Sequence, residues 1–184
     1  CHRVPIQFNK SQGLTVPKKY TPQSQGIGEV VTGDNRVVHS FPSMAKLYLR
    51  ALCRQHEQTH GKHEYQFFSH GAVRNRRRED AIAVQTIINN RLSMAHIPFV
   101  QKFRDITNAF PSPKFEAIRD FNKQFAKDNY FLEDILNQHI EEHICCLEAS
   151  DGVVWSQMGA GVPQGGPKAS EIFNEVYEIA LLDY

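Results

Sequence analysis

Two short segments place the strongest constraint on what this chain can fold into. His96–Ile106 reads HIPFVQKFRDI, an apolar run that predicts a strand ending at Asp105, with a helix to follow. Gly161–Asn174 reads GVPQGGPKASEIFN, a glycine-rich loop that opens a helix. A carboxylate at the end of a strand can reach Mg²⁺, and the free N–H groups of a helix N-terminus attract phosphate. The pair therefore predicts mixed α and β structure around a metal- and phosphate-binding site.

Hydrophobic periodicity predicts four further helices. One runs from Ser43 to Gly61 with the apolar face Met44, Leu47, Tyr48, Ala51 and Leu52, and another starts near Glu79 and buries Val84, Ile87, Ile88 and Leu92. A third begins with the cap Ser112-Pro113 and buries Phe115, Ile118, Phe121 and Phe125. The fourth, Phe131–Glu148, buries Leu132, Ile135, Leu136 and Ile140.

Short β-prone runs complete the pattern. They lie at Gly13–Pro17, at Val30–Thr32, and after a turn at Asp151-Gly152. No internal repeat or low-complexity tract interrupts the chain. We therefore expect an α+β fold, with helices packed on a small, partly antiparallel sheet.

The composition is that of one globular domain with a real core. The chain has 184 residues, 41% of them hydrophobic and 22% charged, and a net charge of +1, which permits a local basic patch but not a strongly basic tail. No apolar run approaches the roughly 20 residues of a membrane span, and no signal peptide is visible. Four cysteines, Cys1, Cys53, Cys145 and Cys146, do not form a disulfide framework. We expect an intracellular, reducing setting, nuclear or cytoplasmic.

Residues 56–60 spell H-E-x-x-H, which in many metalloproteases holds zinc through two histidines and activates water through the glutamate. Here His56 and His60 fall in the last turn before Gly61, where histidine is favoured by the helix dipole. Glu79 is a conceivable third ligand. An inverted form, His139–His143, precedes the adjacent cysteines. We interpret both as ordinary helix residues and keep a zinc metallopeptidase using His56, Glu57 and His60 as the distant alternative.

A basic run follows the first helix. Its four arginines are candidates for gripping a nucleic-acid backbone through phosphate contacts: Arg74, Arg76, Arg77 and Arg78. A solvated loop is the competing interpretation of such a run.

Lys102–Phe110 and Gly161–Asn174 resemble motifs A and B of the palm of reverse transcriptases, specifically those of non-LTR, LINE-like retrotransposons. Members of that family read roughly D-L-S-K-A-F-D and G-V-P-Q-G-S-P in these motifs. Upstream, Val16–Lys19, Arg36–Tyr48 and Tyr65–Ile82 are similar to further segments of the family, in the same order. Five matches in order cover most of the chain, which makes the resemblance more specific than any one of them.

The resemblance implies an RNA-directed DNA polymerase that uses an RNA template, a DNA primer and dNTPs, with Mg²⁺ or Mn²⁺. Asp105 and the carbonyl of Ile106 would be metal ligands, and Phe110 would lie under the incoming sugar and exclude a 2′-hydroxyl. Gln164 and Gly165 would lie against the nucleotide and template. The remaining implied residues would neutralise the triphosphate: Lys18, Lys19 and Arg36.

The chain also departs from the family. The Y-x-D-D hairpin that follows motif B is absent from these 184 residues, Arg104 replaces an apolar residue, and Pro111 replaces an acidic one. The chain begins without Met and its last residue lies in an apolar helical pattern, so we expect a fragment: about 1–100 fingers-like and about 101–184 an incomplete palm. We expect it to be inactive and poorly soluble by itself. The alternative is a non-catalytic nucleic-acid-binding remnant of a retroelement.

Overall fold

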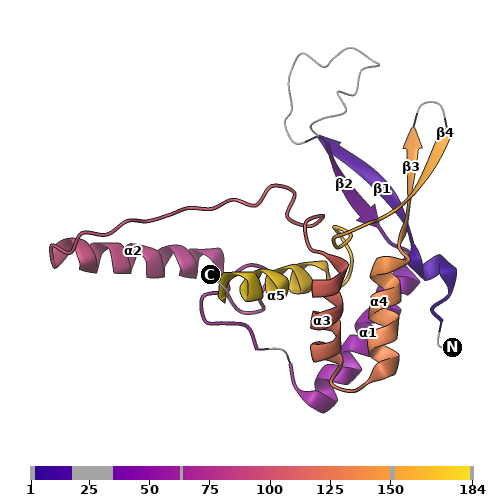
Figure 1. The fold of residues 1–184 in the computed structure, drawn as a ribbon, viewed down its shortest axis with the longest axis horizontal. Coiled ribbons are helices and arrows are strands. Elements are labelled where there is room, and N and C mark those ends of the chain that lie inside the picture. Colours follow the sequence, from indigo (N-terminus) through magenta and orange to yellow (C-terminus); the bar gives the residue numbers. More distant parts are fainter. Residues whose placement is uncertain (1–2, 18–34, 63, 150–151, 183–184) are drawn as a thin grey trace, which may run out of the picture.

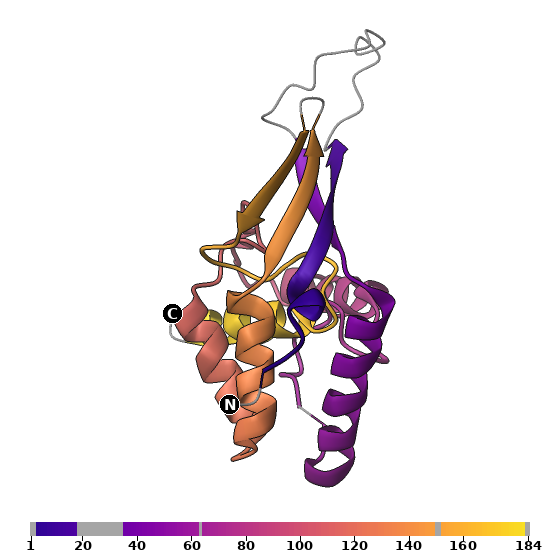
Figure 2. The same cartoon turned by 90° about the vertical axis from the view of Figure 1, so that its right-hand side faces the viewer.

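A four-stranded mixed sheet forms one end of the molecule in the computed structural model, which describes residues 3–17, 35–62, 64–149 and 152–182. Its strands are β1 (Lys10–Pro17), β2 (Asn35–Ser40), β3 (Ile144–Ala149) and β4 (Gly152–Gln157), in the order β2-β1-β3-β4. β1 pairs with β2 antiparallel and with β3 parallel, and β3 pairs with β4 antiparallel. The sheet rises above the helices in Figures 1 and 2.

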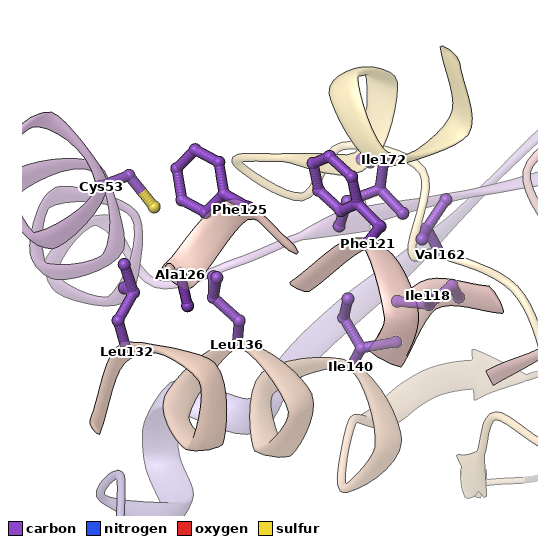
Figure 3. Close-up of a cluster of buried hydrophobic side chains, with 11 residues drawn as sticks. Cys53, Ile118, Phe121, Phe125, Ala126, Leu132, Leu136, Ile140, Val162 and Ile172 are labelled. Atoms are coloured by element: carbon purple, nitrogen blue, oxygen red, sulfur yellow. The ribbon is translucent and has the colours of Figure 1, made fainter. Parts of the chain in front are cut away.

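Helices pack below the sheet around one main core. After a 3₁₀ turn, η1 (Ile6–Asn9), the helices are α1 (Ser43–His60), α2 (Arg78–Met94), α3 (Phe115–Ala126), α4 (Tyr130–Glu141) and α5 (Ala169–Leu182). The core draws Cys53 from α1, Phe121 from α3, Leu136 from α4 and Ile172 from α5 (Figure 3). Removing such side chains from water is the main force that holds helices of this length together. The expected α+β class is confirmed.

α1 begins at Ser43 and is ended by the C-cap Gly61 as predicted, but it buries a different face. Its buried residues are Ala45, Leu49, Cys53 and His56, which are spaced four, four and three positions apart. Met44 and Leu47, which we predicted to be buried, are more than half exposed. Periodicity alone does not choose between neighbouring faces of such a helix, and the packing of α3 and α4 makes the choice.

α2 is a helix as predicted, but its predicted buried stripe is wrong. None of its residues is buried, and Val84, Ile87 and Ile88 are at least half exposed. The segment that follows, residues 95–109, runs back beside α2, where the Asn89 Nδ2 amide donates to Gln101 Oε1 at 3.0 Å. Residues 95–109 are here called the arm. Figure 1 shows α2 and the arm projecting away from the other helices.

The strand predicted for His96–Ile106 does not form. The arm has no ladder partner among the described residues, and Val100 and Phe103 are 96% and 82% exposed. A strand is stabilised by hydrogen bonds to a neighbour and by burial of one face. With neither present, the apolar residues remain in an irregular segment.

Two predicted helix ends also shift. α3 starts at Phe115 rather than beside Ser112, because Ser112 Oγ closes a turn on the Ala109 carbonyl at 2.8 Å. α4 ends at Glu141 rather than Glu148, because residues 144–149 form β3 between β1 and β4. The burial predicted for the apolar residues of α3 and α4 is confirmed, with Phe115 only partly buried.

The predicted strand after Asp151-Gly152 is present as β4, and Gly13–Pro17 lies in β1. Val30–Thr32 and Asp151 of the predicted turn Asp151-Gly152 lie outside the described residues. Among the described helices, none combines the length and the apolar character required to cross a membrane.

Candidate functional site

The glycine-rich loop contacts the chain just beyond the arm through backbone hydrogen bonds. The N–H of Val162 donates to the carbonyl of Phe110 at 2.8 Å, and that of Gly161 donates to the carbonyl of Pro113 at 2.7 Å. Gly161 has φ +85°, and a Cβ there would lie 2.5 Å from Pro111 Cα. Only glycine permits both the backbone angle and this close approach. The exit of the arm and the glycine-rich loop are therefore side by side.

The same loop is bonded to the sheet. The N–H of His39, in β2, donates to the carbonyl of Gln164 at 2.8 Å. Gly165 has φ +103°, and a Cβ there would lie 2.6 Å from His39 O. Arg36 is exposed in the same strand, three residues from His39 and so roughly 10 Å along it. Three segments with predicted nucleotide-side residues thus meet at this loop.

Asp105 lies in the arm, exposed, five residues before Phe110. Its carboxylate accepts a hydrogen bond from the N–H of Ile106 at 3.0 Å. Across the described residues, no group of three or more His, Cys, Asp or Glu side chains is placed to hold a metal ion. The metal-ligand roles of Asp105 and Ile106 stay predictions, and Lys18 and Lys19 lie outside the described residues.

Phe110 is half-buried at the end of the arm. Its ring lies 5.6 Å from that of Phe173, centroid to centroid, and it packs against the main core. The side chain of Gln164 is also half-buried. The structure thus gives Phe110 a packing role, and its predicted role against the sugar is not tested.

The basic run divides into residues with different contacts. Arg76 donates to three backbone carbonyls, at 2.7 Å to Ser69, 3.1 Å to Tyr65 and also to Gln66, and so holds the loop 65–76 together. The N–H of Arg77 donates to the Asp80 carboxylate at 3.1 Å, which caps α2. Binding of nucleic acid by this run stays a prediction, but the guanidinium of Arg76 already has partners.

Arg74 and Arg78 are both exposed, but their surroundings differ from each other. Arg78 pairs at 3.1 Å with Glu79, the conceivable third zinc ligand, and both side chains are mostly exposed. Arg74 faces a cleft shared with α1 and α5. Of the four arginines in the run, Arg74 is the one that lines this cleft together with cations from other segments.

The members of H-E-x-x-H are engaged in contacts that serve the fold. His56 Nε2 bonds to the carbonyl of Phe125 at 2.7 Å, and the rings of His56 and His60 stack at 4.3 Å. Glu57 accepts from Lys168 Nζ at 2.9 Å. A glutamate bound to a buried ammonium is not free to activate water, so these contacts do not suit a peptidase.

Lys168 follows the glycine-rich loop and ties it to α1. Its ammonium bonds to Glu57 and, at 2.5 Å, to Glu171. Burial by itself would lower the pKa of Lys168, but Glu171 and Glu57 outweigh burial and raise it. Sequence reasoning assigned this residue no role, although its place directly after G-G-P at a helix start was a usable signal.

Sequence reasoning also missed a buried polar cluster beneath the sheet, here called the histidine cluster. Ser11 Oγ lies 3.0 Å from His39 Nδ1 and 3.1 Å from His143 Nε2, and these two nitrogens are 3.1 Å apart. The rings of His139 and His143 each lie 4.9 Å from that of Phe41. Burial lowers the pKa of His139 to about 4 and, with His39 and His139 nearby, that of His143 to about 3. The cluster joins β1, β2 and α4 with neutral imidazoles.

Comparison with known proteins yields a likeness of fold. No family model matches the sequence, and no curated protein matches it. The structure is similar to that of apo telomerase from Candida tropicalis truncated from its C-terminal domain, with a TM-score of 0.56 and 14% sequence identity. The match covers 99% of this chain and 40% of the telomerase chain. At this identity the likeness shows the fold alone, and this chain spans less than half the length of that one.

Proposed function

We propose that this chain is the fingers and part of the palm of a reverse-transcriptase-like polymerase, of the type found in non-LTR, LINE-like retrotransposons. One observation carries the proposal: the segments that resemble motifs A and B are bonded to each other, from the N–H of Val162 to the carbonyl of Phe110, and the neighbouring N–H of Gly161 is bonded to Pro113, three residues after Phe110. The likeness to telomerase, a polymerase related to reverse transcriptases, supports it from a different direction.

The proposed partners are an RNA template, a DNA primer and a dNTP. Gln164 and Gly165 would lie against the nucleotide and template, with Phe110 beside the sugar. The loop that carries Gln164 is held by β2, so its position is set by the sheet and not by its own sequence. Arg36, exposed on that strand, would contact the triphosphate, and the same role for Lys18 and Lys19 rests on the resemblance alone.

The described residues do not by themselves fit the Mg²⁺ or Mn²⁺ ions that the family uses. Two divalent cations require several anionic oxygens, since Mg²⁺ prefers carboxylate and phosphate ligands in octahedral geometry. Asp105 is a single exposed carboxylate, and the described residues offer no group of three candidate ligands. We therefore expect the 184-residue chain to bind nucleic acid without extending a primer.

A second candidate function is that of a non-catalytic nucleic-acid-binding remnant. The isolated position of Asp105 favours it, as do Arg104 and Pro111, which depart from the family pattern. The two candidates share the fold and the binding surface. They differ only in whether the parent protein supplies the missing carboxylates.

Primer extension separates the two candidates. In a protein whose coding sequence continues past Tyr184 into an aromatic-x-Asp-Asp segment, we expect extension of a DNA primer on an RNA template that depends on Mg²⁺. Asp105→Ala should lower the extension rate at least about 10³-fold, because metal-bound charge stabilisation contributes several kcal/mol.

Asp120→Ala, which removes an exposed carboxylate from α3, is the matched control and should leave the rate unchanged. A continuation without the two aspartates, or full activity in Asp105→Ala, would reject the polymerase proposal.

A further inference from the structure

A cleft of about 810 Å³ lies between the C-terminal half of α1, the loop that follows it, and the first turn of α5. Five cations and two carboxylates line it. The cations, with which we define the basic cleft, are Arg50, Arg54, Lys62, Arg74 and Lys168. They come from segments far apart in the sequence, so only the fold assembles this surface.

The charge of the basic cleft is mostly uncompensated. Both carboxylates, Glu57 and Glu171, are bonded to the half-buried Lys168. Within the described residues, the other four cations are exposed and form no ion pair: Arg50, Arg54, Lys62 and Arg74. Five cations against two carboxylates leave the cleft with a net charge of +3, and its four unpaired cations make its exposed surface positive.

The arrangement of these cations fits a linear polyanion better than a small anion. Arg50 and Arg54 are four residues apart on α1, which places them on one face at a rise of roughly 6 Å. Lys62 and Arg74 line the same cleft from the segment that follows α1. A small anion needs donors that converge on one point, whereas a row of cations along an open cleft follows successive phosphates.

An exposed aromatic ring lies in the same loop as Arg74. Phe67 is 84% exposed, in the loop that Arg76 holds together. That loop is fastened to α5 by Glu178, which accepts from the N–H of Gln66 at 3.3 Å and from Ser69 Oγ. Glu178 is seven residues from Glu171 at the cleft, roughly 10 Å along α5. Exposed rings beside a basic groove are typical of proteins on which unpaired bases stack.

We propose that the basic cleft binds the phosphate backbone of a single-stranded nucleic acid, and that Phe67 provides a stacking surface for one of its bases. The inference deepens the proposed function and rests on it in one respect: the strand is then the RNA template. The binding chemistry itself, phosphates on guanidinium and ammonium groups and a base on a ring, is common to RNA and DNA single strands.

Binding of the full 184-residue chain to a fluorescent 20-nucleotide single-stranded RNA, measured by anisotropy between 50 and 200 mM salt, tests the proposal. In Arg50→Gln/Arg54→Gln/Lys62→Gln we expect at least tenfold weaker binding at the lowest salt. The slope of log K against log salt should shrink by about 2, because each lost phosphate contact removes about 0.7.

The matched control removes the same charge elsewhere, in Arg3→Gln/Lys114→Gln/Lys123→Gln, whose exposed residues lie outside the cleft. It should weaken binding no more than about twofold. All six positions are exposed, so both variants should keep the parent's urea midpoint. An equal loss in both variants, or an unchanged salt slope in the cleft variant, would overturn the proposal.

Phe67→Ala tests the stacking step separately. It should weaken binding at least about fivefold with the salt slope unchanged, since stacking contributes about 1–3 kcal/mol per base and no counterions are released. Phe103→Ala, an equally exposed ring on the arm, should have no effect. Double-stranded RNA of equal length should compete poorly, and equal competition by the duplex would reject a single-strand site. Single-stranded DNA of the same length, used as a competitor, shows whether the cleft distinguishes ribose from deoxyribose.

The outcomes separate this inference from the proposed function. Asp105→Ala should bind the RNA as the parent does, because Asp105 is not in the cleft. Cleft-dependent binding without primer extension in the longer protein would reject the polymerase and retain the cleft. Extension that depends on Asp105, with binding unaffected by the cleft variant, would reject the cleft and retain the polymerase.

Discussion

Gly161 shows at the scale of one residue how the two motif segments are joined. Its φ of +85° lies in the left-handed region, and a Cβ would overlap Pro111 Cα and the Phe110 carbonyl. Its N–H is also bonded to Pro113. The residue thus combines a backbone angle, a close approach and a hydrogen bond that no other amino acid provides together.

We expect Gly161→Ala to lower the free energy of unfolding by more than about 2 kcal/mol, from backbone strain together with the displacement of Pro111. Urea unfolding followed by circular dichroism measures this, with an unchanged m-value showing that the midpoint shift reports stability. Gly159→Ala is the control, because nothing lies within 4 Å of its added methyl. It should stay within about 1 kcal/mol of the parent, and a Gly161→Ala protein as stable as this control would contradict the packing described.

Two arginines of the basic run show that the sequence does not decide which side chains remain available to a ligand. Arg74 and Arg76 are two positions apart in the sequence. The first faces the basic cleft, and the second donates to carbonyls of its own loop. The sequence predicts the positive charge of the run correctly. Which guanidinium remains available to a ligand depends on how the loop closes, and that closure involves Glu178 on a distant helix.

At the scale of elements, α2 and the arm show that a local preference for helix or strand does not by itself bury a segment. The pattern of Val84, Ile87, Ile88 and Leu92 correctly predicts a helix. Burial of that stripe requires a neighbouring surface, and none of the described elements covers it. The same holds for the arm, where an apolar run typical of a strand lacks a partner. Open apolar surface of this kind is consistent with the poor solubility expected from the sequence.

We expect Val100→Asp/Phe103→Asp to raise the solubility of the chain and to change its free energy of unfolding by no more than about 0.5 kcal/mol. Both side chains are almost fully exposed, so charging them costs no buried contact. Light scattering against concentration and urea unfolding provide the two readouts. Phe121→Asp, in the core, should unfold the protein and serves as the contrast. A destabilisation above about 2 kcal/mol in the arm variant would show that the arm is packed in solution.

At the scale of the whole molecule, the sheet connects the two ends of the sequence. β1 and β2 come from residues before 41 and β3 and β4 from residues after 143, joined by the parallel β1–β3 pair. The core likewise takes Cys53 from the first half and most of its other residues from the second. The division into fingers-like 1–100 and palm-like 101–184 stays a prediction. In either case, the two parts share one sheet and one core.

The histidine cluster at this junction makes the stability of the molecule depend on pH. Unfolded imidazoles take up protons near pH 6.5, whereas His139 and His143 do so in the folded state only at about 4 and about 3. Between these values the unfolded state binds more protons, so stability falls as pH falls below about 6.5 and is unaffected by these groups above it. At pH 4.5 we expect a loss on the order of 2 kcal/mol for each group relative to pH 7.5.

Urea midpoints at the two pH values check this expectation. His139→Leu removes one titrating group and two buried nitrogens that have no hydrogen-bond partner among the described residues, so its pH dependence should be flatter. Equal midpoints for the parent at pH 7.5 and 4.5, or the parent's slope in His139→Leu, would contradict the assignment of neutral buried imidazoles.

Sequence alone determined the α+β class, the helices α1 to α5 and the loop before α5, because helical periodicity, glycine and proline act over a few residues. Only the tertiary structure decided three other features: which face of α1 is buried, that residues 96–106 form no strand, and where α4 gives way to β3. It also assembled the basic cleft and the histidine cluster. Each of these depends on a partner supplied by a distant segment, since ladder hydrogen bonds, burial and shared charge exist only between surfaces that the fold brings together.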